Sequence, residues 1–203
     1  MTSEYEKGLQ DAIKFHGHLC AGLAIGYMAS KVAIDWLELK RSQDEELVAI
    51  VESDGCAIDA IQSMLGCSIG KGNLIFRDYG KMVFTVIRRD NNKAVRIALS
   101  ADVFKRSKEE NMIMKKAFSD DATEDDQRKF WDLQQKWINK ILSTDKNKLF
   151  HTKEVHVEIP EKAKIFDSVI CHFCGESVME PRARLREGKP ACIPCAENYT
   201  RGW

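Results

Sequence analysis

The cysteines of this chain are the residues best suited to metal or thiol chemistry, and four of its seven lie near the C-terminus in two C-x-x-C pairs. Cys171 and Cys174 form the first pair, and Cys192 and Cys195 form the second. Two such pairs supply four thiolates, a common ligand set of tetrahedral structural zinc. Because so short a tail cannot build a hydrophobic core of its own, zinc binding is its expected source of folding energy.

The residues around the two pairs are typical of a treble-clef zinc finger, in which a knuckle, a hairpin and a helix surround the ion. The expected knuckle turns at Gly175, the hairpin comprises residues 178–186 and 189–191, and the helix begins near residue 196. Asp167 or Glu176 could replace one thiolate, because carboxylate oxygen also binds zinc, and His172 is a reserve ligand. Incidental or redox-active cysteine pairs are the alternative interpretation.

A second group of candidate ligands lies near the N-terminus, where His16, His18 and Cys20 follow one another closely. In an extended chain their three side chains share one side, whereas in a helix His16 and Cys20 lie one turn apart and His18 faces away. Either geometry keeps one imidazole beside the thiol. Glycines in and after this stretch allow close approach by a ligand or by another backbone.

Cys56 is the expected partner of this stretch, because it follows Asp54-Gly55 at the point where a strand should meet a helix. A helix N-terminus is electropositive and lowers the pKa of a thiol, and ligands of α/β proteins usually bind outside the carboxyl end of a strand. We therefore predict a second metal or reactive-thiol site. Its candidate ligands are His16, His18, Cys20 and Cys56. Cys56 and His18 are the residues expected to act in catalysis there.

Cys67 and the glycine-rich stretch from Gly66 to Gly72 fit this site less well. A continuous helix would place Cys67 about 16 Å along its axis from Cys56, so both thiols could bind one ion only if the chain folded back at the glycine between them. The stretch also departs from the phosphate-binding loop, because its first two glycines are one residue too close and a glycine replaces the magnesium-binding hydroxyl. Lys71 could neutralise an anionic substrate or could simply be solvated.

Composition and charge exclude several functional classes. Apolar residues make up 44% of the 203-residue chain, enough for a sizeable core, and the formal net charge is zero. A neutral chain has no long-range attraction to nucleic acid, so a dedicated nucleic-acid binder is not expected. No apolar run is long enough to span a membrane, and the N-terminus lacks the features of a signal peptide. Together with cysteines in metal-type spacing, these features favour a cytoplasmic protein.

Hydrophobic periodicity and capping residues predict an α+β core followed by the small zinc-binding domain. Helices are expected at residues 3–14, 20–39, 57–65, 109–118 and 124–142, and strands at 47–51, 82–88, 94–99 and 155–159. Ser53-Asp54 should cap the helix that Gly66 ends, and Thr123 should cap the helix from 124. We expect a core domain of residues 1–160 that holds the metal cleft, and a zinc-finger domain of residues 165–203.

At these motifs the sequence resembles the family of proteins similar to the E-subunit of formylmethanofuran dehydrogenase. The matching residues are Phe15-His16-Gly17-His18-x-Cys20-x-Gly22, Asp54-Gly55-Cys56 and Gly66-Cys67-x-x-Gly70-Lys71-Gly72-Asn73. The tail from Cys171 to Cys195 is similar to a zinc-binding extension that some members carry. Ala21 departs from the pattern, which often has proline there, but this change removes no ligand.

The resemblance implies a thioredoxin-like core with a mixed β-sheet flanked by helices, a metal-binding cleft built from the His/Cys motif, and a homodimer. It also implies a partner, because the family is associated with the molybdenum or tungsten enzyme that forms formylmethanofuran. The chain lacks the usual cysteine spacing of iron–sulfur proteins, so within such a complex it would be an accessory subunit.

These observations favour a metal-binding protein with zinc in its tail and a second metal, expected to be zinc, in the core. An incompletely filled coordination sphere at the core site would leave a position for water or substrate, as in catalytic zinc sites. The reaction is left open. The competing hypothesis is a non-enzymatic accessory or regulatory subunit that contacts a partner through the zinc finger, and a third is thiol redox chemistry at Cys56.

Overall fold

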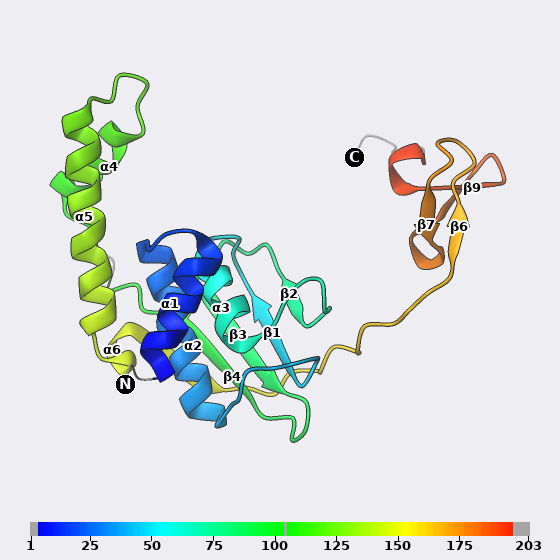
Figure 1. The fold of residues 1–203 in the computed structure, drawn as a ribbon, viewed down its shortest axis with the longest axis horizontal. Helices are drawn as coiled ribbons and strands as arrows, with labels where there is room; N and C mark the ends of the chain where they lie inside the picture. The colour runs from blue at the N-terminus through cyan, green and yellow to red at the C-terminus, as the bar shows by residue number, and fades with distance from the viewer. Residues whose placement is uncertain (1–3, 104, 197–203) are drawn as a thin grey trace. The chain divides into compact units, whose positions relative to one another are not determined.

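The computed structural model describes residues 4–103 and 105–196. The chain divides into two compact units, Met1–Lys162 and Ala163–Trp203 (Figure 1). Among the described residues, no helix is long and apolar enough to cross a membrane.

The first unit is built on a five-stranded mixed sheet in the order β2-β1-β3-β4-β5. Its strands are β1 (Leu47–Val51), β2 (Leu74–Phe76), β3 (Val83–Arg88), β4 (Ala94–Leu99) and β5 (Phe150–Glu154). β1 pairs parallel with β2 and antiparallel with β3, and the remaining pairs are antiparallel. The mixed sheet that the resemblance implied is therefore present, while the likeness to thioredoxin stays a prediction.

Three helices, α1 (Glu4–His16), α2 (Ala21–Leu37) and α3 (Ala57–Leu65), cover one face of this sheet (Figure 1). Alternate residues of β1, such as Ala49 and Val51, pack with these helices in the main hydrophobic core. The intervening residues Val48 and Ile50 face the opposite way and pack in a second cluster. This division follows from the two-residue period of a strand, in which neighbouring side chains point to opposite faces.

The remaining helices of the first unit are α4 (Lys108–Ala117), α5 (Glu124–Ser143) and the short α6 (Lys146–Leu149). The predicted cap at Thr123 is confirmed, because its hydroxyl accepts from the Asp126 amide while the Asp126 carboxylate accepts from the Thr123 amide. Such a capping box satisfies amides that have no partner within the helix. In α5, Trp137 and Ile141 are buried, as the spacing of apolar residues indicated.

Two local predictions are wrong. Residues 155–159 form no strand, because β4 pairs instead with Phe150–Glu154, and Val155 only adds a last hydrogen bond from its amide to the Ala94 carbonyl. The cap of α3 is Cys56 rather than Ser53-Asp54, and the buried Ser53 hydroxyl lies 3.8 Å from the Met82 sulfur. The end of α3 at Gly66, in the left-handed conformation with φ +70°, is confirmed.

The second unit consists of two small hairpins. β6 (Ser168–Ile170) pairs with β7 (Ser177–Met179), and β8 (Arg184–Arg186) pairs with β9 (Lys189–Ala191). Single turns of 3₁₀-helix follow at Glu180–Arg182 and Ile193–Cys195. The knuckle and the hairpin around residues 187–188 are thus present, whereas positions 197–199 of the predicted final helix lie outside the described residues.

Candidate metal centres

The first centre begins where the chain passes from α1 to α2. α1 ends at His16, and Gly17 then turns the chain with a φ of +95°, a conformation that favours glycine. Cys20 is the N-cap of α2, and its sulfur accepts a hydrogen bond from the Leu23 amide at 3.3 Å. The Cys20 sulfur therefore lies at the positive end of the helix dipole of α2.

Two glycines of α2 bring the start of α3 against this turn. A Cβ on Gly22 would lie 3.1 Å from the Cys56 Cβ, and one on Gly26 would lie only 2.0 Å from the carbonyl oxygen of Ala57. Gly22 and Gly26 are four residues apart and so share one face of α2. Because this face has no side chains at these two positions, α3 begins in direct contact with α2, and its N-cap Cys56 reaches Cys20.

His16, Cys20 and Cys56 form a cluster of three potential ligands, whose donor atoms all lie within 4.8 Å of one another. The His16 Nε2 atom is 3.9 Å from the Cys20 sulfur. Tetrahedral zinc with bonds of about 2.0–2.3 Å holds its ligand atoms roughly 3.3–3.8 Å apart, so small side-chain movements would suffice to bind an ion. Cys20 is partly buried and Cys56 is exposed, which leaves one side of the cluster open to solvent.

A carboxylate that sequence reasoning missed lies behind the imidazole. His16 Nδ1 is 2.6 Å from the Asp59 carboxylate, and the Gln62 side-chain amide donates to the other oxygen of Asp59 at 3.3 Å. Asp59 belongs to α3 and lies one turn after Cys56. The signal in the sequence is this spacing of three residues, which places an acid on the helix face that carries the thiol.

The pKa of the Cys56 thiol is raised above its usual value, contrary to the expectation for a helix N-terminus. The largest cause is desolvation by the surrounding atoms, although one side of the residue is open, and the neighbouring Cys20 adds to it. When one of two neighbouring thiols is ionised, its negative charge opposes ionisation of the other. At Cys56 this repulsion and the desolvation together outweigh the backbone, which alone would lower the pKa. The same crowding favours a bound cation, because a metal ion neutralises both thiolates.

His18 is placed beside this cluster rather than in it. Its ring centroid is 4.7 Å from that of His16, and its side chain is exposed. Of the two histidines left open by the sequence, the structure thus brings His16 to the thiols.

Cys67 is kept apart from the other thiols. It follows the left-handed Gly66 at the far end of α3 and is completely buried in the main core. Burial raises the pKa of its thiol to about 12. Cys67 therefore behaves as a small apolar core residue.

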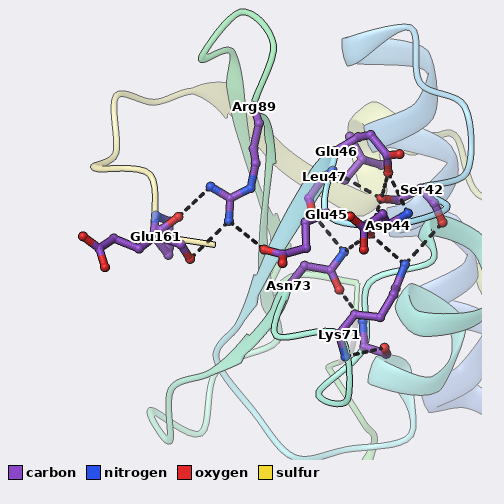
Figure 2. Close-up of polar contacts among 11 residues, drawn as sticks. Ser42, Asp44, Glu45, Glu46, Leu47, Lys71, Asn73, Arg89 and Glu161 are labelled. Carbon is purple, nitrogen blue, oxygen red and sulfur yellow. Dashed lines mark hydrogen bonds and ion pairs between the residues drawn. The ribbon is translucent and has the colours of Figure 1, made fainter. Parts of the chain in front are cut away.

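Lys71 and Asn73 hold the loop before β1 in place (Figure 2). The Lys71 ammonium donates to the carbonyl oxygens of residues 42–44 at 3.4, 3.2 and 2.8 Å. The Asn73 amide nitrogen donates to the carbonyls of Asp44 and Leu47, and its oxygen accepts from the Ser68 amide. These bonds engage the ammonium fully, so the hypothesis that Lys71 neutralises a substrate is not supported.

An ion pair between Arg89 and Glu45 lies on the other side of the loop before β1 (Figure 2). The Arg89 guanidinium lies 3.5 Å from the buried Glu45 carboxylate and donates to the carbonyl oxygens of Pro160 and Glu161. The segment after β5 is thereby joined to the loop before β1, which anchors the end of the first unit.

The second centre consists of the four C-terminal cysteines. Their sulfurs all lie within 4.8 Å of one another, and those of Cys174 and Cys192 are 3.8 Å apart. The Cys192 amide donates to the Cys171 sulfur at 3.3 Å, and this bond is the largest cause that lowers the Cys171 pKa to about 6. Gly175 makes the predicted tight turn with a φ of +78°.

The alternative ligands of the tail lie outside this set. Glu176 is 3.7 Å from the Cys174 sulfur but is not among the four clustered residues, and the His172 ring contacts the Lys189 ammonium at 2.9 Å. The Asp167 backbone carbonyl accepts from the Glu180 amide. The four clustered cysteines therefore supply enough ligands for a tetrahedral zinc ion without a carboxylate or an imidazole.

Comparisons with known proteins match both units. Residues 15–151 match the family model described as FmdE, molybdenum formylmethanofuran dehydrogenase operon. Residues 164–201 match the prokaryotic dksA/traR C4-type zinc finger, and with the four-cysteine cluster this supports the prediction of zinc at the C-terminal site.

Two relatives extend this comparison. A probable S-adenosyl-L-methionine-binding protein of Archaeoglobus fulgidus is 32% identical over 204 residues, which cover 97% of this chain and 54% of that protein. The chain thus spans about half the length of that relative. The crystal structure of an FmdE-like protein of tungsten formylmethanofuran dehydrogenase from Syntrophus aciditrophicus has a TM-score of 0.62 at 20% identity, over 94% of this chain and 91% of that one, and shows the same fold.

Proposed function

Because this chain belongs to the FmdE family, we propose that its core binds a second zinc ion in addition to the zinc of the C-terminal finger. His16, Cys20 and Cys56 are its ligands. The observation that carries this proposal is the convergence of three soft donor atoms from α1, α2 and α3 within 4.8 Å.

The charge and exposure of the cluster fit a catalytic type of zinc site. Two thiolates and a neutral imidazole balance the double charge of the ion, and three protein ligands leave a fourth position for water or substrate. Cys56 is exposed, so a small molecule can reach that position. A zinc ion bound there would supply Lewis-acid chemistry, lowering the pKa of a coordinated water or polarising a carbonyl group.

The surroundings of the cluster support the same function. The N-termini of α2 and α3 meet at Cys20 and Cys56, so two thiols from different helices lie side by side at the site. The protein thus orients one imidazole and two thiolates, and it leaves Cys56 exposed to solvent.

Metal counting tests the proposal. We expect two zinc ions per chain in the wild type, and one each in Cys56→Ala and Cys171→Ala, measured by plasma mass spectrometry on protein purified with zinc. Cys67→Ala is the matched control, because it removes a thiol that lies outside both clusters, and it should keep two ions. A wild type with one ion that persists in Cys56→Ala would exclude the core site.

A non-enzymatic role for the finger is the second candidate. The finger exposes large apolar side chains, among them Ile165, Ile170 and Leu185, at 102%, 62% and 78%. A contiguous exposed apolar patch is typical of an interaction surface, and we propose that these side chains contribute to one. If the chain is an accessory subunit, purified molybdenum or tungsten formylmethanofuran dehydrogenase should bind it, and Leu185→Asp should weaken binding while Cys56→Ala should not. Equal binding by the wild type and Leu185→Asp would argue against this surface.

We also propose that the chain forms a homodimer through α4 and α5. Met112, Phe118 and Trp131 on this helical hairpin are 71%, 73% and 51% exposed, and α4 buries only Ala117 among its described residues. Sedimentation equilibrium should give twice the chain mass of 23.1 kDa. Trp131→Glu should then shift the protein to monomer, and a wild-type monomer would contradict the proposal.

A further inference from the structure

Asp59 lies next to the core cluster but offers no ligand to it. Its carboxylate oxygen lies 2.6 Å from His16 Nδ1, a distance typical of a strong, charge-assisted hydrogen bond. The Gln62 amide holds the second oxygen at 3.3 Å. The side chains of His16 and Asp59 are 12% and 34% exposed, so the imidazole is largely shielded from water while the carboxylate is partly solvated.

The contact decides which nitrogen of His16 can bind a metal ion. A neutral imidazole carries one proton, and the nitrogen with the proton donates while the other accepts. A carboxylate can only accept, so in a neutral His16 this contact places the single ring proton on Nδ1 and leaves the lone pair of Nε2 free. Nε2 is the atom that lies 3.9 Å from the Cys20 sulfur and thus points into the cluster.

We propose that Asp59 is a positioning residue that fixes the tautomer and the ring orientation of His16, so that Nε2 is presented to a metal ion. This inference rests on the proposed core zinc site and deepens it. Carboxylates that accept from the second ring nitrogen of a metal-bound histidine raise its basicity and restrict its rotation. α3 supplies both this carboxylate and the ligand Cys56, so one rigid helix sets two parts of the site.

A purely structural role for Asp59 must be separated from this one. Asp59 also lies in the first turn of α3, where a negative charge stabilises the helix N-terminus. A change in folding stability alone would therefore not test the inference. The useful readouts are the affinity for zinc at the core site and the tautomer of His16.

The experiment compares Asp59→Ala and Asp59→Asn with Asp54→Ala in the full chain. Asp54 is the matched control, because it is an exposed acid two residues before Cys56, and its replacement removes the same charge without touching His16. Competition with a chromophoric chelator should show a loss of core zinc affinity of about 10–100-fold in Asp59→Ala, the range typical of such carboxylates. Asp59→Asn keeps the shape of the side chain and a neutral acceptor, so its loss of zinc affinity should be smaller than that of Asp59→Ala. Asp54→Ala should change the zinc affinity by less than about threefold.

Nitrogen NMR of the histidine ring gives the second readout. In the metal-free wild type, at a pH where the ring is neutral, His16 should carry its proton on Nδ1, and this preference should weaken in Asp59→Ala because no bound metal then fixes the tautomer. Unchanged affinity and an unchanged tautomer in Asp59→Ala would overturn the inference while leaving two zinc ions per chain, and hence the proposed function, intact. A wild type without core zinc would overturn both.

Discussion

A methyl group on Gly26 would test whether the close crossing of α2 and α3 builds the core cluster. A Cβ there would lie 2.0 Å from the Ala57 carbonyl oxygen and 2.7 Å from two further backbone atoms of Ala57. Favourable non-bonded contacts between carbon atoms lie at about 3.5–4.0 Å. In Gly26→Ala the two helices must therefore separate by on the order of 1 Å, a shift that no side-chain rotation can replace.

The expected cost combines two opposing effects. Overpacking of a well-packed core costs about 1–3 kcal/mol, and a clash with rigid backbone belongs near the upper end of this range. Alanine forms helix better than glycine by about 1 kcal/mol, which offsets part of the cost. We expect Gly26→Ala to lower the free energy of unfolding by about 2 kcal/mol, and to weaken core zinc binding because Cys56 moves away from Cys20.

Urea unfolding followed by circular dichroism measures the first effect, and chelator competition measures the second. Gly70→Ala is the control, because a Cβ at Gly70 would meet nothing within 4 Å, and its free energy of unfolding should change by no more than about 0.5 kcal/mol. If Gly26→Ala unfolds at the same urea concentration as the wild type and keeps its zinc affinity, the crossing does not position the cluster as we argue.

Three further outcomes follow from the contacts of single residues. Lys71→Met should lower the free energy of unfolding by about 1–2 kcal/mol, because the carbonyls of residues 42–44 lose their donor. Metal counting on this variant should still give two zinc ions, and the loss of an ion would contradict a purely structural role for Lys71. The finger should release zinc to a chelator as the pH falls, because protons compete with the ion for the four thiolates. Equal zinc affinity at pH 5 and pH 8 would be inconsistent with binding by thiolates. In the metal-free protein, the raised pKa of Cys56 should make its alkylation by iodoacetamide at pH 8 slower than that of a model thiol, and zinc should protect it further; mass spectrometry of the labelled peptide measures both rates.

The parts of the fold that depend on neighbouring residues were predictable from the sequence. Thr123 and Gly66 mark the start of α5 and the end of α3 because capping bonds and left-handed turns involve residues only a few positions apart. β3 and β4 were predictable for a similar reason, since a short polar turn joins them. β5 was misplaced, because its register is decided by β4, about 50 residues earlier in the chain, and alternation alone does not reveal a partner.

The core site was only partly predictable from the sequence. The sequence singled out Cys20 and Cys56 by residue type and by their neighbouring glycines, but it left open whether His16 or His18 joins them. The structure brings His16 to the thiols because α1 continues to that residue and Gly17 then turns the chain. The role of Asp59 was not predicted. Acids are common in the first turn of a helix, and only the contact with His16 distinguishes Asp59 as part of the site.

The four C-terminal cysteines were predictable as zinc ligands from the sequence, because they lie in two local pairs with a spacing common in zinc sites. The structure then showed that the two pairs converge and that Glu176 is not among the clustered residues. Only the tertiary structure decided the composition of the core cluster. Its members come from three helices, and they meet because Gly22 and Gly26 let α3 approach α2 more closely than any side chain would allow. Such an approach depends on packing between distant segments, which spacing along the chain does not record.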